Sequence, residues 1–214
     1  MKLSDRLQAV LDLVPEGSVL ADIGTDHGLL IVQALLTQKV TFAYALDIAK
    51  KPLESAKNNI IHFGLEDKTS LQLRNGLEGF SDKANCFVVA GMGAETILGI
   101  IKDYPFDEDS VIILQSNTKL AWLRSELIST GFDIIDEIFL IDKKIPTTIM
   151  KVVKRKASIQ LSLVDIWIGP ILKSSNNIAY LEHLKGRMEH LERIMHHDEL
   201  LKIEYTTIKK FLTK

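Results

Sequence analysis

The sequence has little cysteine and no long hydrophobic run. A single cysteine, Cys86, occurs among 214 residues, so a disulfide framework is excluded and a reducing compartment is expected. Its position at the start of an apolar strand indicates a structural role. No uninterrupted apolar stretch approaches the length that spans a bilayer, and the first residues, MKLSDR, lack a signal-peptide pattern. We therefore expect a soluble cytoplasmic protein with no membrane partner.

The net charge is also small, at −2, but it is unevenly distributed. Residues 1–150 contain 14 Lys and Arg against 21 Asp and Glu, whereas residues 151–214 contain 12 against 7. A basic segment that follows an acidic one is typical of an appendage that meets a polyanion such as RNA. The alternative is the solvated surface of a helical hairpin, which needs no partner.

A third absence is the G-x-G-x-x-G turn that binds the pyrophosphate of a dinucleotide. The stretch DIGTDHG has instead two glycines, Gly24 and Gly28, with Asp22 and Asp26 beside them. Gly24 allows a ligand to approach the backbone, and Gly28 is expected to let the next helix press onto the strand. Two carboxylates disfavour a pyrophosphate and favour a cationic, hydroxyl-bearing ligand such as S-adenosylmethionine. An ordinary strand-to-helix turn is the alternative interpretation.

Short apolar runs alternate with amphipathic segments as far as about residue 154, which predicts an α/β fold with a mostly parallel sheet. The expected helices include 3–14, 28–37, 95–102, 120–130 and one that begins near Pro52 and is capped by Gly64. The expected strands are 19–23, 41–46, 70–74, 86–90 and 111–114, followed by an antiparallel pair, 132–141 and 147–153, with a turn at 143–146. Ligands of such sheets bind outside the carboxyl ends of the parallel strands.

The composition changes near Lys154, and the rest of the chain is predicted to be helical. A short helical segment over 161–168 precedes a long helix from Asn176, and Asp198 is expected to cap a last helix. These two long helices predict an antiparallel, coiled-coil-like hairpin. The apolar stripe expected along the long helix is Ile178, Leu181, Leu184, Met188, Leu191 and Met195. The chain is accordingly divided into a domain of residues 1–154 and a helical domain of residues 155–214.

Polar residues follow several predicted strands at their carboxyl ends. Asp47 lies about twenty residues beyond the glycine turn, where an acidic side chain accepts hydrogen bonds from ribose hydroxyls. Asn75 offers a donor and an acceptor to an adenine edge, although Asn75-Gly76 also suits a plain turn. Met92, between two glycines, suits close contact with a flat group. Gln115 and Asn117 follow a buried strand and are expected in the crevice.

Histidines occur in the glycine turn and in the helical tail. His27 is a candidate general base, and a backbone-anchoring hydrogen bond is the alternative. The tail histidines have spacings that do not suit one metal ion, so we expect a solvated or RNA-facing role and no metal site; they are His183, His190, His196 and His197.

Several motifs agree in order and spacing with one known family. They are DIGTDHG at 22–28, LDIAKKP at 46–52, NGLE at 75–78, VAGMG at 89–93 and LQSN at 114–117. With the helical tail, they make the chain resemble the bacterial tRNA (adenine-22-N1)-methyltransferase family over nearly its whole length. The resemblance implies a class I S-adenosylmethionine-dependent fold, Rossmann-like, with a seven-stranded sheet, an antiparallel last strand and a C-terminal coiled-coil hairpin that helps to hold tRNA.

The resemblance also implies roles for individual residues. The cofactor would contact Asp22, Gly24, Thr25, His27, Gly28, Asp47, Ile48, Asn75, Gly76, Ala90, Gly91 and Met92. The tRNA would contact Gly93, Gln115, Lys185, Arg187 and Arg193. We expect Asp26 and Asn117 to orient the target adenine or to stabilise the cation formed at its N1. We also expect a monomer, and removal of 155–214 to weaken tRNA binding more than cofactor binding.

The chain departs from the family pattern at three places. Ser116 stands where the family usually has proline, Ala94 stands where glycine is common, and the segment 144–148 lacks the family's aromatic residue. These differences concern base recognition more than the cofactor site. Three other functions remain open from the residues alone: a small-molecule methyltransferase, a nicotinamide dehydrogenase, and a non-catalytic cofactor-binding protein that oligomerises through its tail.

Overall fold

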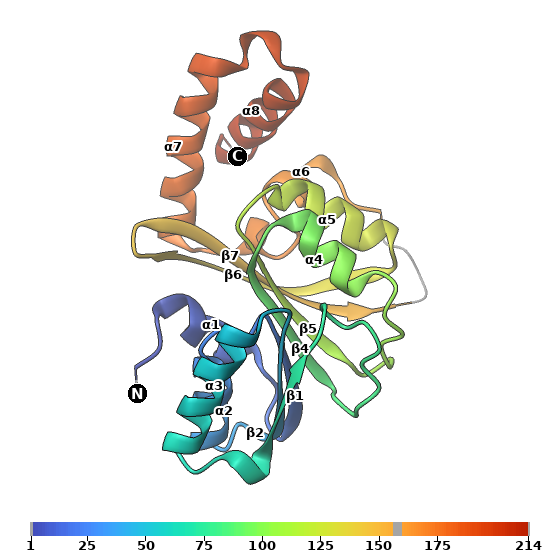
Figure 1. Ribbon diagram of the computed structural model, residues 1–214. Coiled ribbons are helices and arrows are strands. Elements are labelled where there is room, and N and C mark those ends of the chain that lie inside the picture. Colours follow the sequence, from blue (N-terminus) through green and yellow to red (C-terminus); the bar gives the residue numbers. More distant parts are fainter. Residues whose placement is uncertain (1, 156–159, 214) are drawn as a thin grey trace.

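A computed structural model describes residues 2–155 and 160–213 of the chain. Within these residues one seven-stranded sheet has the order β3-β2-β1-β4-β5-β7-β6 (Figure 1). The five strands β3, β2, β1, β4 and β5 run parallel to one another. β7 lies between β5 and β6 and is antiparallel to both. The strands are β1 (Ser18–Ile23), β2 (Val40–Asp47), β3 (Thr69–Leu73), β4 (Cys86–Met92), β5 (Val111–Ser116), β6 (Phe132–Asp142) and β7 (Ile145–Lys154).

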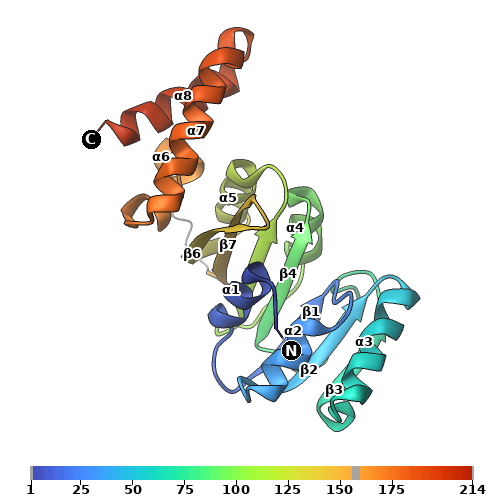
Figure 2. The ribbon, with the colours of Figure 1, turned by 90° about the vertical axis from the view of Figure 1, so that its left-hand side faces the viewer.

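Helices cover both faces of the sheet, as Figures 1 and 2 show. Three helices pack with buried side chains of β1 and β2 in one hydrophobic cluster: α1 (Asp5–Leu13), α2 (Leu29–Leu36) and α3 (Lys50–His62). A short 3₁₀ turn, η1 (Glu66–Lys68), precedes β3. Two helices form a second cluster on the opposite face: α4 (Ala94–Ile101) and α5 (Leu120–Ser129). The predicted α/β sheet with an antiparallel strand near one edge is confirmed.

The turn between β6 and β7 is tighter than predicted. We expected a turn over 143–146, whereas Asp142 pairs with Ile145 and only Lys143 and Lys144 form the bend. Both lysines have positive φ, at 49° and 70°, which is the backbone geometry of a two-residue hairpin turn. Because Ile149 pairs with Gln115 near the end of β5, the β6–β7 hairpin extends beyond the parallel strands on the ligand side.

Cys86 is buried at the start of β4, and burial raises the pKa of its thiol to about 12. That environment keeps the thiol neutral and unreactive, as its position in the sequence predicted. No helix in the described part of the chain combines the length and apolar character needed to cross a membrane.

The tail has the predicted helical hairpin. Its elements are α6 (Leu163–Trp167), η2 (Leu172–Ser174), α7 (Ile178–Ile194), η3 (Met195–His197) and α8 (Glu199–Leu212). The Asp198 carboxylate accepts hydrogen bonds from the backbone N–H groups of Leu200 and Leu201, so the predicted cap is confirmed. α6 begins two residues later than expected because Ser162 and Asp165 form a capping box there.

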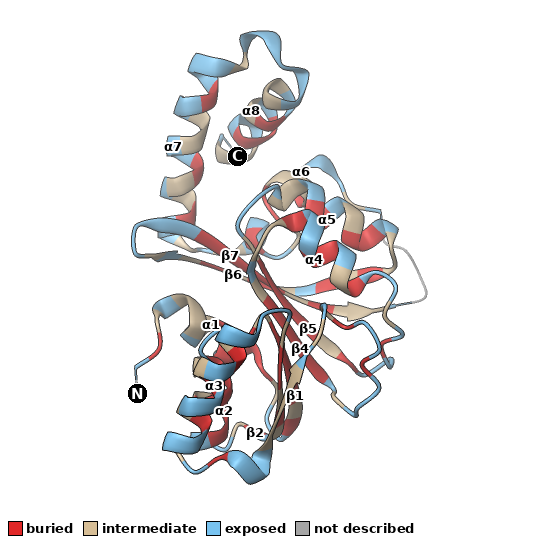
Figure 3. Cartoon of the chain, viewed as in Figure 1, coloured by how far each residue is buried: buried red, intermediate tan, exposed pale blue. Residues whose placement is uncertain are grey.

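One part of the predicted apolar stripe is wrong. Figure 3 shows that buried and exposed residues alternate along α7. Leu184 and Leu191 are buried as expected, but Ile178 is 72% exposed and Tyr180 is buried in its place. The reason is that α7 starts at Ile178, and its first turn is positioned by Tyr180. The ring centre of Tyr180 lies 4.8 Å from that of Phe139, and the Tyr180 hydroxyl donates to the carbonyl of Ile168.

The tail joins the sheet through a buried ion pair that the sequence analysis did not identify. Arg124 on α5 donates to Glu137 on β6 at 2.8 Å, and both side chains are almost fully buried. The second carboxylate oxygen of Glu137 accepts the backbone N–H groups of Ile171 and Leu172 at 3.1 and 3.2 Å. The start of the tail therefore packs against the larger domain. Residues 156–159, just after the predicted domain boundary, lie outside the described residues.

Candidate functional site

Two glycine-containing turns meet at the carboxyl ends of the central strands. Gly24, after β1, has φ +78°, and a Cβ there would collide with the terminal methyl of Met92, which lies at the end of β4. The backbone N–H groups of Gly24 and Thr25 donate to the carbonyl of Leu46 at 2.8 and 3.2 Å, which ties the same turn to β2. The ends of three neighbouring strands are thus held together around one narrow space.

Gly28 has a different neighbour from the one predicted. We expected it to let α2 press onto the strand, but its position faces α3, where a Cβ would lie 3.0 Å from the Cβ of Ala56. Its φ of +65° begins α2 in the left-handed region, which glycine adopts without strain. The glycine therefore allows close packing of two helices, and the expected contact with the strand was wrong.

Asp22 is the most strongly perturbed acid of the site. Its carboxylate is buried at the end of β1 and accepts a 2.8 Å hydrogen bond from the hydroxyl of Thr25. Burial is the main cause that raises its pKa to about 6, assisted by the nearby Asp47 and opposed by Thr25 and Arg6. A buried carboxylate that is ionised at neutral pH is well suited to receive a cationic group of a ligand.

Arg6 belongs to the site although the sequence analysis did not select it. It lies on α1 and lines a small cavity of about 90 Å³ together with Asp22, Gly24 and Asp26. A signal was present in the sequence, because Arg6 is three residues after Leu3 and four before Val10 on the apolar side of that helix. A charged residue in an apolar stripe indicates a specific partner.

Gln115 and Asn117 connect the ends of β4 and β5 through their side-chain amides. The oxygen of Gln115 accepts hydrogen bonds from Arg6 and from the backbone N–H of Gly91, both at 3.0 Å. Its nitrogen donates to the oxygen of Asn117 at 3.0 Å, and the nitrogen of Asn117 donates to the carbonyl of Gly91 at 2.8 Å. Gln115 is buried and Asn117 is exposed, so only Asn117 presents its amide to an incoming group.

Ser116, at the position where the family usually has proline, makes two local hydrogen bonds in the turn after β5. Its hydroxyl donates to the carbonyl of Thr118 at 2.6 Å and accepts the N–H of the same residue at 3.2 Å. These local bonds restrain the backbone after β5 as a pyrrolidine ring would. The hydroxyl of Thr118 in turn accepts the N–H of Ala94 at 3.3 Å, next to Gly93 at the start of α4.

His27 and Asp26 occupy the exposed outer side of the first turn. The Nδ1 of His27 is hydrogen-bonded to the hydroxyl of Ser55 at 2.5 Å. The backbone carbonyl of His27 accepts a hydrogen bond from the side-chain amide of Asn59 at 2.8 Å. Its other ring nitrogen is 3.6 Å from the carboxylate of Asp26. These contacts favour the anchoring role of His27 over the general base. Asp26 has φ +49° and extends its carboxylate toward solvent at the mouth of the cavity.

The predicted ribose and adenine contacts lie along the ends of β2 and β3. One carboxylate oxygen of Asp47 accepts the N–H of Ala49 at 2.8 Å, which orients the side chain, and the adjacent Ile48 is 69% exposed. The amide nitrogen of Asn75 donates to Glu78 at 3.2 Å within a turn that includes Gly76. Both the adenine contact and the plain turn remain compatible with this geometry.

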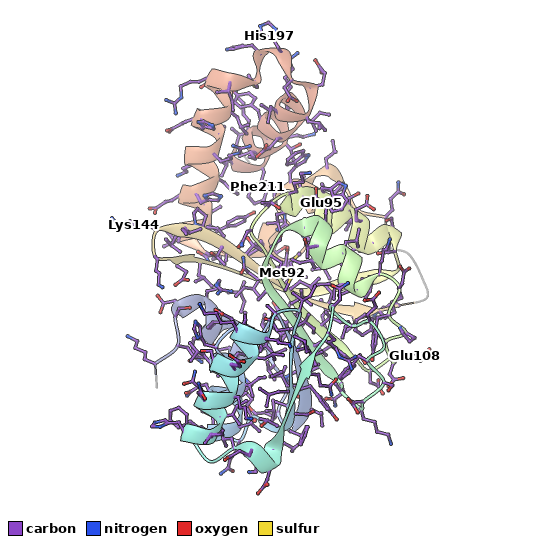
Figure 4. All side chains as sticks on the ribbon, viewed as in Figure 1. Met92, Glu95, Glu108, Lys144, His197 and Phe211 are labelled. Atoms are coloured by element: carbon purple, nitrogen blue, oxygen red, sulfur yellow. The ribbon has the colours of Figure 1, made fainter. Side chains whose placement is uncertain are left out.

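The predicted tRNA-binding cations of the tail lie on one helix outside the sheet. Lys185, Arg187 and Arg193 are all on α7, and Figure 4 shows His197 at the far end of the hairpin from Met92. Arg187 is held by two hydrogen bonds to Glu204 on α8, at 2.7 and 2.8 Å. Lys185 and Arg193 are exposed, and no ion pair of theirs occurs among residues 2–155 and 160–213.

Comparisons with known proteins identify the family of the chain. A family model described as a methyltransferase domain matches residues 3–150. The tRNA (adenine(22)-N(1))-methyltransferase of Bacillus subtilis is 32% identical over 91% of this chain and 84% of its own length. The structure of TrmK from M. capricolum with S-adenosylhomocysteine has a TM-score of 0.86 at 29% identity, covering 100% of this chain and 99% of that one.

The structure of the B. subtilis m1A22 tRNA methyltransferase TrmK gives the same TM-score, 0.86, at 27% identity and covers 99% of both chains. These similarities extend through the helical tail and are not confined to the sheet. The chain belongs to the tRNA (adenine(22)-N(1))-methyltransferase family.

Proposed function

We propose that this protein transfers a methyl group from S-adenosylmethionine to N1 of adenine 22 in tRNA. The observation that carries the proposal is the narrow site where Gly24 and Met92 meet beside the buried carboxylate of Asp22. It has a cavity for a small charged group on one side and an exposed amide, Asn117, on the other. A nicotinamide dehydrogenase does not fit, because a pyrophosphate would face two carboxylates, those of Asp22 and Asp26.

The residues present fit S-adenosylmethionine. Its α-ammonium and α-carboxylate are matched by Asp22 and Arg6, which line the same cavity with opposite charges. Asp47 would accept hydrogen bonds from the ribose hydroxyls, while Ile48 and the Asn75–Gly76 turn would contact the adenine. When bound, the cofactor supplies an electrophilic methyl group on a sulfonium. The absence of a side chain at Gly24 lets the terminal methyl of Met92 pack against the turn at that end of the site.

Cofactor affinity is expected to fall about tenfold when the pH is lowered from well above 6 to 5. Asp22 has a pKa of about 6, so one pH unit lower most of it is protonated and no longer offers a negative charge to the α-ammonium. Calorimetric titration with S-adenosylhomocysteine at several pH values measures this change. The Asp22→Asn variant should bind the cofactor weakly, with an affinity that does not change with pH. If its affinity still falls as much at low pH as that of the parent protein, the titration belongs to another group.

The proposed transfer requires little acid–base chemistry. Adenine N1 already has a lone pair in the ring plane, so the protein need not remove a proton before the methyl is transferred. Catalysis then depends on holding the nucleophile in line with the methyl group and on excluding water. Asn117 would orient the base, with the network of Gln115 and Gly91 fixing its amide. Asp26 would stabilise the positive charge that develops on the methylated ring.

We further propose a division of labour between residues 1–154, which bind the cofactor, and residues 155–214, which help to hold tRNA. The exposed Lys185 and Arg193 would contact phosphates and make binding depend on salt. Arg187 would contribute mainly by fixing α8 against α7, since its guanidinium is already occupied by Glu204. Gly93, next to Met92, would line the passage through which the adenine enters.

The direct test is tritium transfer from labelled S-adenosylmethionine to unmodified bacterial tRNA, followed by nuclease mapping of the labelled nucleoside. We expect label in 1-methyladenosine at position 22. A matched tRNA with guanosine at that position should remain unlabelled. Absence of label from every tRNA, with cofactor binding intact by calorimetry, would overturn the substrate assignment and leave the fold and cofactor site unaffected.

A further inference from the structure

A second and larger cavity begins where the catalytic crevice ends. It has a volume of about 760 Å³ and lies between the turn after β5, the β6–β7 hairpin and the helical tail. Asn117 lies at its edge on the sheet side, and α7 and α8 form the opposite wall. We call this cavity the interdomain groove. Lys144 marks the end of the β6–β7 hairpin in Figure 4, beyond the wall that Pro146 contributes.

The interdomain groove contains both tryptophans of the chain. Trp122, on α5, is 38% exposed, and Trp167, on α6, is partly buried. On the tail side, the ring of His183 stacks on Phe139, with ring centres 5.2 Å apart and an angle of 27° between the planes. Large aromatic surfaces are rarely left exposed in a groove without a ligand, and bases of single-stranded nucleic acid stack on such rings.

The charges of the groove also suit nucleic acid. Three cationic side chains, Lys119, Arg124 and Arg187, line it. Arg124 is buried in its pair with Glu137 and Arg187 is bound to Glu204, so Lys119 carries the exposed charge of the groove. Lys119 precedes α5 with φ +48° and is held by an ion pair with Glu95 on α4. The ammonium group of Lys119 is therefore fixed in place by a neighbour, so its binding to a phosphate would lose less conformational entropy than that of a free side chain.

The reaction requires a neighbouring nucleotide to be accommodated. An adenine inside a helical arm must leave its stack before its N1 can reach an enzyme site, and the adjoining backbone is displaced with it. Asn117, beside which the target base would enter, lines one edge of the interdomain groove. We propose that this groove binds the nucleotide next to the methylated adenine in an unstacked conformation, with its base on the face of Trp122. The proposal rests on the proposed tRNA methyltransferase function.

Intrinsic fluorescence gives a direct test, because the groove contains both tryptophans. Unmodified tRNA added to the full-length protein with saturating S-adenosylhomocysteine should quench the emission. Quenching should persist in Trp167→Phe, which retains Trp122, and should be largely lost in Trp122→Phe. Trp122→Ala should raise the KM for tRNA about tenfold, as expected for loss of a base-stacking contact. Trp122→Phe should restore most of this affinity because it keeps an aromatic face.

Leu163→Ala is the matched control, since Leu163 is a large exposed side chain of α6 outside the groove. It should leave the KM for tRNA and the fluorescence change at the parent values. Affinity for S-adenosylhomocysteine, measured by calorimetry, should be equal in all variants and verifies that each is folded. A parent KM in Trp122→Ala, together with tRNA binding that does not quench, would overturn the groove assignment while methyl transfer itself stands. Failure of the parent protein to methylate any tRNA would instead overturn the proposed function and this inference with it.

Discussion

Replacing Glu137 by glutamine is expected to lower the free energy of unfolding by about 3–5 kcal/mol, because it leaves the buried guanidinium of Arg124 without its counter-charge. The substitution preserves side-chain volume, so lost packing does not explain the effect. It also weakens the acceptor for the N–H groups of Ile171 and Leu172, which loosens the start of the tail. Equilibrium unfolding in urea measures the change. The slope of the free energy of unfolding against urea concentration should be the same in both proteins if each unfolds in one cooperative step.

The matched control lies on the same strand. Asp133 pairs with Arg155 at 3.3 Å in a more exposed setting, so Asp133→Asn should change stability by only about 0–1 kcal/mol. Equal stability losses in the two variants would contradict the role given to burial. Gly169 is part of the same arrangement, because a Cβ at that position would collide with the carboxylate of Glu137.

This ion pair depends on the tail for part of its hydrogen bonding. Deletion of 155–214 removes the backbone donors of Glu137 and the carbonyl of Ile166, to which Arg124 donates at 3.1 Å. The truncated chain would then contain an Arg124–Glu137 pair without these hydrogen-bond partners. A loss of tRNA binding in that deletion would combine loss of contacts with loss of stability. Charge-neutralising changes at Lys185 and Arg193 test the tail while leaving that centre intact.

Asp26→Asn is expected to lower kcat about a hundredfold with little change in cofactor affinity, a loss typical of removing one preorganised electrostatic contact. Asparagine tolerates the positive φ of this residue, 49°, and keeps the shape of the side chain, so the variant isolates the charge. Asp26→Ala should lose a similar factor in kcat and additional stability. Single-turnover methyl transfer with saturating tRNA, together with calorimetry of S-adenosylhomocysteine, separates the two effects.

The opposite result would place Asp26 in the cofactor site. If Asp26→Asn lowers cofactor affinity as much as it lowers turnover, the carboxylate belongs to the cofactor site and does not act on the base. Thr37→Ala, in the C-terminal cap of α2 and away from the turn, serves as a variant that should change neither quantity.

Much of the fold could be predicted because its signals are local. Apolar runs near β1 and β4, the glycines after them, and the cap at Asp198 each depend on a few adjacent residues. The predictions were wrong where a contact between distant parts of the chain overrode the local sequence pattern. Ile178 has the spacing of a core residue but is exposed, because Tyr180 packs against Phe139, more than forty residues earlier in the chain.

The sequence by itself determined the α/β class, the order of the elements, the helical tail and the two turns that contain Gly24 and Met92. Tertiary structure alone placed Arg6 beside Gln115, 109 residues away, and Arg124 beside Glu137 under the tail. It also brought Trp122 and Trp167 into one groove. The physical reason is that propensity and periodicity describe how a segment folds on itself, whereas these contacts depend on how helices pack across the sheet, which no local pattern encodes.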